Sequence, residues 1–267
     1  AGLLALWAQT VLSAWRWRLV GRALGQHLTA RRALSEYFLA QLVNQTLPGG
    51  VLGDVARAWR SVDGAGRARA AAAVLTERLL GQAAMLAMLA VGLIWAALSP
   101  GAIRVPPAVL IPAGVVLAAL AALLIGLRLS PRVVQAGSAL LTARVLLPQL
   151  GLSLLAAAAN LAAFDFAARA TGTALPPAAV LVLVPLILLT MLVPVTISGW
   201  GLREGAAAAL FPLAGAAAGA GLAASTGFGL IFLTSSLAGA AFFALHGLMT
   251  ARGGKARPRP QNPETPQ

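Results

Sequence analysis

Cysteine is absent from this chain of 267 residues, and charged residues make up only 10% of it. Without thiols, disulfide bonds, zinc–thiolate sites and cysteine nucleophiles are excluded. The two histidines, His27 and His246, stand far apart in the sequence, so we expect neither a metal site nor a proton relay. A P-loop, an H-E-x-x-H motif and a dinucleotide-binding glycine pattern are also missing. We therefore expect no cofactor, no nucleotide-driven step and no enzyme activity.

Hydrophobic residues, in contrast, make up 59% of the chain. Soluble domains carry about 25% charged residues, which makes a soluble fold untenable here. A membrane-spanning helix needs roughly 20 apolar residues, and four windows are long enough: 79–98, 106–127, 145–168 and 222–249. The sequence predicts an all-α, polytopic membrane protein.

The formal net charge of +13 comes from basic residues in short segments beside these windows. That distribution follows the positive-inside rule and favours contact with anionic lipid headgroups, not with nucleic acid. The segment Trp15-Arg16-Trp17-Arg18 is typical of an anchor at the membrane surface. We expect a multi-pass protein of a bacterial inner (cytoplasmic) membrane, with a membrane domain over 1–251 and a disordered cytoplasmic tail over 252–267.

Two apolar stretches are interrupted by polar segments of similar composition, at 44–57 and 194–205. In each, proline ends a helix, glycines turn the chain, and an acid and an arginine open the next helix. Inside a bilayer, free backbone groups persist only where protein or a water-filled cavity satisfies them, so paired breaks point to a transport site. The residues expected to build the breaks are Pro48, Gly49, Gly50, Gly53, Pro194, Gly199 and Gly201.

The charge pattern predicts how these broken segments enter the membrane. The segment 178–197 starts outside, and 202–214 is too short to cross back. We therefore expect 178–214 to form a hairpin that enters the membrane from the outer side and leaves on the same side. The short amphipathic segment 31–43 would begin a matching hairpin that enters from inside. Of the twenty Lys and Arg residues, this topology places only Arg104 and Arg169 outside and Arg203 within the membrane. The sequence thus predicts two inverted re-entrant hairpins.

Charged residues at membrane depth normally face a cavity or pair with each other. Asp54 and Arg57 lie on one face of the helix after the first break, and Arg203 and Glu204 open the helix after the second. The arginines could bind phosphate beside helix N-termini. Alternatively, Asp54 at an N-cap position and Glu204 merely cap helices while each arginine neutralises its neighbour.

Further polar residues carry open alternatives. Four of them could line the cavity or simply satisfy backbone groups at the breaks: Asn44, Gln45, Thr46 and Ser198. Glu77 and Arg78 either reach the cavity or form an interfacial ion pair. Trp200 could stack on a substrate or pack the hairpin tip against a helix. We expect a local salt bridge between Asp165 and Arg169, and close helix packing over 213–225.

The motifs N-x-x-L-P-G-G-x-x-G-D-x-x-R over 44–57, Glu-Arg-Leu-Leu-Gly over 77–81 and G-x-G-x-R-E-G ending at 205 form a specific combination. Together with the Arg-Trp element at 15–18, they resemble the lysylphosphatidylglycerol synthase transmembrane-region family, also described as flippase-like. The resemblance covers nearly the whole chain. It implies movement of an anionic or aminoacylated phospholipid, or a related lipid-linked headgroup, between leaflets. By this resemblance the cavity candidates are Asp54, Arg57, Glu77, Arg78, Arg203 and Glu204.

Lipid translocation is therefore the leading hypothesis, with membrane phospholipid as the partner. The alternatives are an intramembrane enzyme that modifies a lipid headgroup and a non-transporting partner of a separate synthase; a homo-oligomer is also possible. The soluble aminoacyl-transferase domain of full synthases does not follow the membrane part in this chain, so synthase activity is not carried over. Because the chain starts at Ala1 with a short apolar run, 2–14, we expect a preceding helix in the natural protein.

Overall fold

The computed structural model describes residues 1–62, 66–99, 103, 105–111, 114, 118, 142–193 and 196–254. Within these ranges every regular element is helical, apart from one isolated β-bridge, which confirms the all-α class. The elements are α1 (Gly2–Ala23), α2 (Ala30–Thr46), α3 (Leu52–Arg60), α4 (Arg67–Leu98), α7 (Ala143–Ala170), α8 (Pro177–Leu189), η1 (Thr190–Leu192), α9 (Leu202–Leu210), η2 (Phe211–Ala214) and α10 (Ala218–Gly254).

Three of these helices are long and apolar enough to cross a membrane: α4, α7 and α10. They contain the predicted windows 79–98, 145–168 and 222–249. At 1.5 Å per residue, the 32 residues of α4 extend for about 48 Å, well beyond a hydrocarbon core of about 30 Å. The predicted window 106–127 lies largely outside the described residues. The domain boundary predicted at 252 falls inside α10, and 255–267 also lie outside the described residues.

The first break separates α2 from α3. Leu47 ends α2 in an extended conformation (φ −109°, ψ 149°), because a residue before proline is sterically excluded from the helical region. Gly49 and Gly50 then turn the chain with φ of +88° and +61°. A Cβ atom at Gly53 would collide with the backbone of Ala40, so glycine lets α3 pack closely against α2. The two helices form one hairpin.

The second break has the same design. The apolar helix α8 tightens into η1, and the chain turns through Ser198, Gly199 and Gly201, all with positive φ, before α9 begins. Pro194 lies outside the described residues. Close packing predicted for 213–225 is confirmed at Gly221, where a Cβ atom would meet the backbone of Ala207. This contact joins α10 to the second hairpin.

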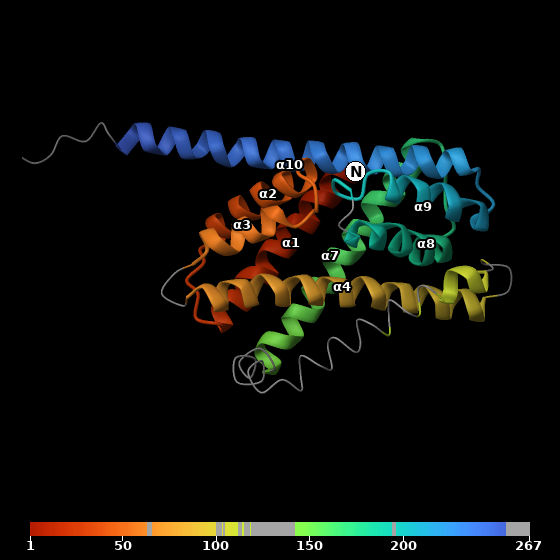
Figure 1. Ribbon diagram of the computed structural model, residues 1–267, viewed down its shortest axis with the longest axis horizontal. Helices are drawn as coiled ribbons and strands as arrows, with labels where there is room; N and C mark the ends of the chain where they lie inside the picture. Colours follow the sequence, from red (N-terminus) through yellow and green to blue (C-terminus); the bar gives the residue numbers. More distant parts are fainter. Residues whose placement is uncertain are drawn as a thin grey trace, which may run out of the picture.

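The tips of the two hairpins meet. Pro48 and Ile197 form an antiparallel β-bridge between the breaks. The hairpins approach this point from opposite ends of α4: α3 contacts the N-terminal part of α4 near Glu77, and α8 packs on its C-terminal part at Gly92. Figure 1 shows both hairpins between the long helices α4 and α10, with α7 crossing behind.

Basic residues gather at one end of this arrangement. Arg18 donates to the Leu28 carbonyl, Arg32 donates to the Arg60 carbonyl, and Arg60 pairs with Glu36. These contacts bring together the C-terminal end of α1, the start of α2 and the end of α3. The first hairpin therefore opens at the basic end of the molecule.

The bridge at the tips predicts an efficient cross-link. Residues paired in an antiparallel bridge have Cα atoms about 4.5–5.5 Å apart, within the range that a disulfide spans. Because the chain has no cysteine, the double variant Pro48→Cys/Ile197→Cys carries the only two thiols. We expect mild oxidation in membranes to join them nearly completely, as measured by protection from a maleimide mass tag. The matched pair Pro48→Cys/Ala174→Cys should stay reduced; equal cross-linking of both pairs would contradict the tip contact.

Candidate functional site

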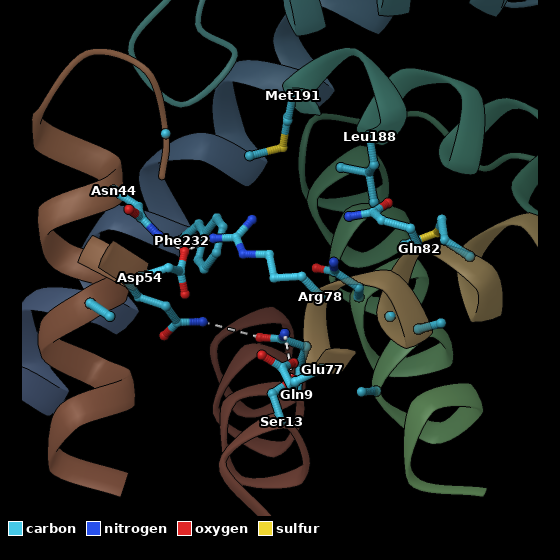
Figure 2. Close-up of a pocket in the computed structure, with 18 of the residues that line it drawn as sticks. Gln9, Ser13, Asn44, Asp54, Glu77, Arg78, Gln82, Leu188, Met191 and Phe232 are labelled. Atoms are coloured by element: carbon cyan, nitrogen blue, oxygen red, sulfur yellow. Dashed lines mark hydrogen bonds and ion pairs between the residues drawn. The ribbon is translucent and has the colours of Figure 1, made fainter. Parts of the chain in front are cut away.

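A cavity of about 210 Å³ lies where the hairpin tips, α1, α4, α7 and α10 converge (Figure 2). It is smaller than the roughly 300–1,000 Å³ pockets that enclose drug-sized ligands, so it suits a headgroup better than a whole lipid. Both breaks contribute to its wall, through Gly50 and Asp54 from the first and Ser198 from the second. Of the residues predicted to form the site, those that line the cavity are Asn44, Asp54, Glu77, Arg78 and Ser198.

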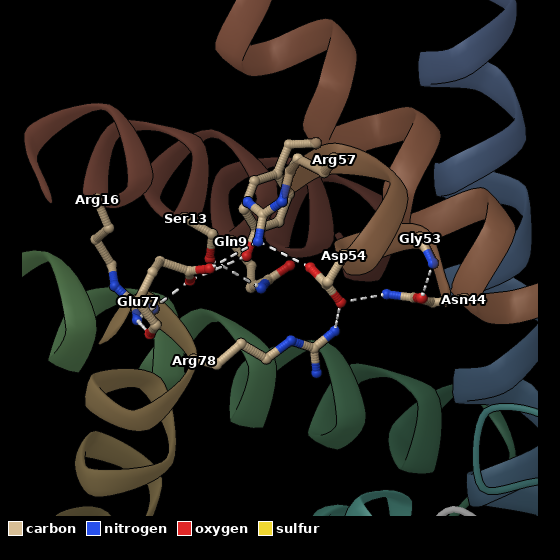
Figure 3. A network of polar contacts seen from close by, with 10 residues as sticks. Gln9, Ser13, Arg16, Asn44, Gly53, Asp54, Arg57, Glu77 and Arg78 are labelled. Carbon is tan, nitrogen blue, oxygen red and sulfur yellow. Dashed lines mark hydrogen bonds and ion pairs between the residues drawn. The ribbon is translucent and has the colours of Figure 1, made fainter. Parts of the chain in front are cut away.

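Arg57 lies behind this lining, at the centre of an ion-pair network (Figure 3). Its Nη2 donates to Asp54 Oδ1 at 2.8 Å and to Glu77 Oε2 at 3.1 Å. The guanidinium carbon lies 4.6 Å from the ring centre of Trp17 and 4.4 Å from that of Tyr37. Arg57 is fully buried. It therefore holds α3 against α4, while rings from α1 and α2 cover its faces.

Asp54 does not cap α3, because the helix begins at Leu52 and Asp54 stands in its first turn. Its second oxygen, Oδ2, accepts from Asn44 Nδ2 at 2.7 Å and pairs with Arg78. Asn44 Oδ1 in turn accepts from the backbone N–H of Gly53 at 2.7 Å. The capping predicted for Asp54 thus belongs to Asn44 on the preceding helix, and this leaves the Asp54 carboxylate for the arginines.

Glu77 joins a second arginine to the network. Its Oε1 lies 3.3 Å from Arg16 Nη2 and accepts from the Tyr37 hydroxyl at 3.1 Å. Arg16 and Trp17 are both buried in the protein. The predicted role of this segment as an anchor in the lipid headgroups is therefore wrong for these two residues; only Trp15, with Arg18 stacked on it, remains exposed.

Arg78 differs from the other two arginines in its exposure. Its side chain is 36% exposed, against 4% for Arg16 and 0% for Arg57. Glu77 and Arg78 do not form the local pair that was the alternative prediction, since Arg78 pairs with Asp54 instead. Arg78 is the network's accessible cation at the cavity surface.

The charges of this network do not cancel. Three guanidinium groups, of Arg16, Arg57 and Arg78, surround the two carboxylates of Asp54 and Glu77, so one positive charge is left over. All four carboxylate oxygens already have a donor. The wall is thus prepared to take a negatively charged group.

The second break contains an ion pair whose charges cancel. Arg203 is fully buried and donates through Nη2 to Glu204 Oε1 at 2.8 Å and through Nε to Ser225 Oγ at 3.0 Å. Glu204 also accepts from the Gly201 N–H at 2.6 Å, which is the capping role foreseen as the alternative. The rings of Trp200 and Phe228 flank the guanidinium at 5.1 and 5.3 Å. Neither charged residue lines the cavity, so this pair ties α9 to α10.

Two smaller predictions are also resolved. The ring of Trp200 packs against α10 at Gly229, where a Cβ atom would clash with it, so the packing alternative holds. Asp165 and Arg169 form the predicted salt bridge, with 2.7 Å between Oδ2 and Nε. It lies on the surface, away from the cavity.

The sequence did not reveal most of the neutral residues in the cavity wall. Six carboxamides contribute to this wall, more than any charged type, and of these the sequence suggested only Asn44 and Gln45 as cavity residues. Only the three on α2 show a helical spacing in the sequence, and the other three stand singly on α1, α4 and α7. The six are Gln9, Gln41, Asn44, Gln45, Gln82 and Asn160. Among the described residues, no group of three or more acidic or histidine side chains could hold a metal ion.

Comparison with known protein families decides the relationship. The family model described as the lysylphosphatidylglycerol synthase TM region matches residues 1–239. The chain belongs to this family. No curated protein and no solved structure matches it. Membership indicates a membrane protein with a lipid-related function, and the family motifs at 44–57 and 77–81 are the segments that build the charged wall.

This family member should depend on the balance of its buried charges for stability. Glu77→Gln removes one carboxylate and leaves Arg16 and Arg57 poorly compensated, which should cost about 3–5 kcal/mol. Adding Arg57→Met restores the charge balance, so the double variant should be destabilised by less than the sum of the two single variants. Equilibrium unfolding in mixed micelles measures both effects.

Asp165→Asn is the control, because it breaks an exposed pair worth at most about 1 kcal/mol. Strictly additive effects of Glu77→Gln and Arg57→Met would show that the two residues are not coupled.

Proposed function

We propose that the chain moves an anionic phospholipid between the leaflets of the membrane, with the headgroup in the cavity and the acyl chains in lipid. The observation that carries this proposal is the unbalanced positive charge in a cavity lined by both breaks. A phosphodiester carries one negative charge, which matches the single excess cation. Membership of a family with a lipid-related function supports the same reading.

Arg78 is the residue that would meet the phosphate. It is the most exposed of the three arginines, and a guanidinium can bind two phosphate oxygens at once. If Arg78 turned from Asp54 to the phosphate, Asp54 would keep its bonds to Arg57 and Asn44. Arg57 and Arg203 would then act as positioning residues that hold the hairpins, and not as ligands as the sequence suggested.

The hairpins would supply the path. We propose that they enter the membrane from opposite sides, the first from the basic, cytoplasmic side and the second from outside. Their approach from opposite ends of α4 and the contact of their tips support this arrangement (Figure 1). Separation of the tips at Pro48 and Ile197 would let a headgroup pass. The C-terminal end of α10 would be cytoplasmic, and the membrane would be a bacterial inner membrane.

No bond is made or broken in this proposal. Both carboxylates in the charged wall are engaged by arginines, and such a pairing disfavours their use as a general base. Transport of an unmodified lipid is thus favoured over a reaction at its headgroup. Mass spectrometry of the lipids recovered from the transport assay below would reveal any modified headgroup.

Transport is tested in proteoliposomes that contain fluorescent phosphatidylglycerol, with dithionite to quench the outer leaflet. The protein should accelerate exchange over empty liposomes. Arg78→Ala should slow it about tenfold or more, since a hydrogen bond to a charged group contributes about 1.5–3 kcal/mol. Arg78→Lys keeps the positive charge but cannot donate to two phosphate oxygens at once. Its transport rate should therefore lie between that of the unaltered protein and that of Arg78→Ala.

The control variant is Arg169→Ala, whose arginine is exposed and does not line the cavity; it should transport as the unaltered protein does. Folded protein that moves no anionic lipid would overturn the proposed function, and an unchanged rate for Arg78→Ala would overturn the role of Arg78.

The opposed hairpins predict opposite accessibility for two loops. His27 is exposed in the loop before α2, and Ala174 is exposed in the loop before α8. In right-side-out vesicles, a membrane-impermeant maleimide should label Ala174→Cys and spare His27→Cys, and inverted vesicles should reverse the result. Labelling of both variants from the same side would exclude inverted hairpins.

A further inference from the structure

The cavity has a neutral polar wall beside its charged wall, and the two together specify a headgroup. The carboxamide of Gln45 is buried, with the residue only 5% exposed, and among the described residues neither its Nε2 nor its Oε1 has a hydrogen-bond partner. Asn160 Oδ1 is likewise buried without a partner in the described part of the chain. Both residues line the cavity, on α2 and α7. Buried polar groups in native proteins are almost always paired, so these atoms call for a ligand or ordered water.

The chemistry of these groups selects among headgroups. A carboxamide offers donors and an acceptor, and a hydroxyl group both donates and accepts, so the two match in either direction. An ammonium group only donates. It would also need a carboxylate, and the four oxygens of Asp54 and Glu77 are already occupied. The excess positive charge of the network would repel it.

We infer that the cavity selects phospholipids with an uncharged, hydroxyl-bearing headgroup, such as a glycerol or a sugar, over aminoacylated or other cationic headgroups. The inference rests on the proposed function of the cavity as a headgroup site. The phosphate lies at Arg78, and the hydroxyl groups pair with the amide groups of Gln45 and Asn160. The selected lipid is therefore anionic as a whole.

The test compares three lipids that differ only in the headgroup. Phosphatidylglycerol has the hydroxyl groups, phosphatidylmethanol has the same charge without them, and lysylphosphatidylglycerol has a cationic aminoacyl group. Binding to the solubilised protein is measured by native mass spectrometry, and transport by the liposome assay. Phosphatidylglycerol should exceed phosphatidylmethanol about tenfold in both, the factor expected from two neutral hydrogen bonds. Lysylphosphatidylglycerol should be the weakest of the three.

Variants of the two amide residues test whether these residues cause the preference for phosphatidylglycerol. Gln45→Leu and Asn160→Leu replace the amide groups by apolar groups of similar shape, so each should reduce the preference for phosphatidylglycerol over phosphatidylmethanol, and together they should bring it below about twofold. Because the readout is a ratio within one protein, a change in expression or yield does not affect it. Gln149→Leu is the matched control: it removes another buried carboxamide from α7, one that has no partner in the described ranges and does not line the cavity. Its ratio should match that of the unaltered protein.

The two proposals fail in different ways. Equal binding of the two anionic lipids, an unchanged ratio in the double variant, or a preference for the cationic lipid would overturn the headgroup inference even if transport occurs. Preferential binding that depends on Gln45 and Asn160, without any transport, would support the headgroup site and overturn translocation. Absence of both binding and transport would overturn both proposals.

Discussion

The structure depends on one constraint: charge and free backbone groups placed among apolar helices must find partners within the protein. Arg57 shows how the charge is compensated, although its Nε and Nη1 have no hydrogen-bond partner among the described residues. Its charge is shared by Asp54 and Glu77, its faces lie against Trp17 and Tyr37, and none of it is exposed. Four helices supply these partners, so the burial of one arginine fixes α1, α2, α3 and α4 relative to each other.

The two breaks repeat a local design with different results. Each places an arginine in the first turns of the helix that follows, and each arginine is fully buried beside an acid and between two aromatic rings. At the second break the charges cancel and Ser225 completes the contacts, which fastens the hairpin to α10. At the first break Arg16 and Arg78 add cations from other helices. The excess charge of the cavity is therefore a property of the packing, and not of either motif alone.

Because the excess charge arises from packing, only part of the site could be predicted from the sequence. Hydropathy and the proline and glycine pattern predicted the helices α4, α7 and α10 and both breaks, because these features depend on neighbours along the chain. The partnership of Arg16 with Glu77 spans 61 positions, and no local pattern encodes it. Arg57 looked like a ligand because it stands at a break, yet packing buries it and exposes Arg78 instead. Asn160 was missed because a single neutral amide on an apolar helix has no distinctive spacing.

The pairing of cations with acids in the cavity also suits a protein that must release what it binds. A passage through a membrane needs sites that favour entry without retaining the ligand. Three unpaired arginines would bind a phosphate tightly and, when empty, would leave several desolvated charges. Two carboxylates reduce this to a single excess charge, and they give Arg78 a partner, Asp54, to which it can return. On the proposed function, exchange of Arg78 between Asp54 and a lipid phosphate keeps nearly the same number of ion pairs in both states, so the loaded and empty cavities would differ little in energy.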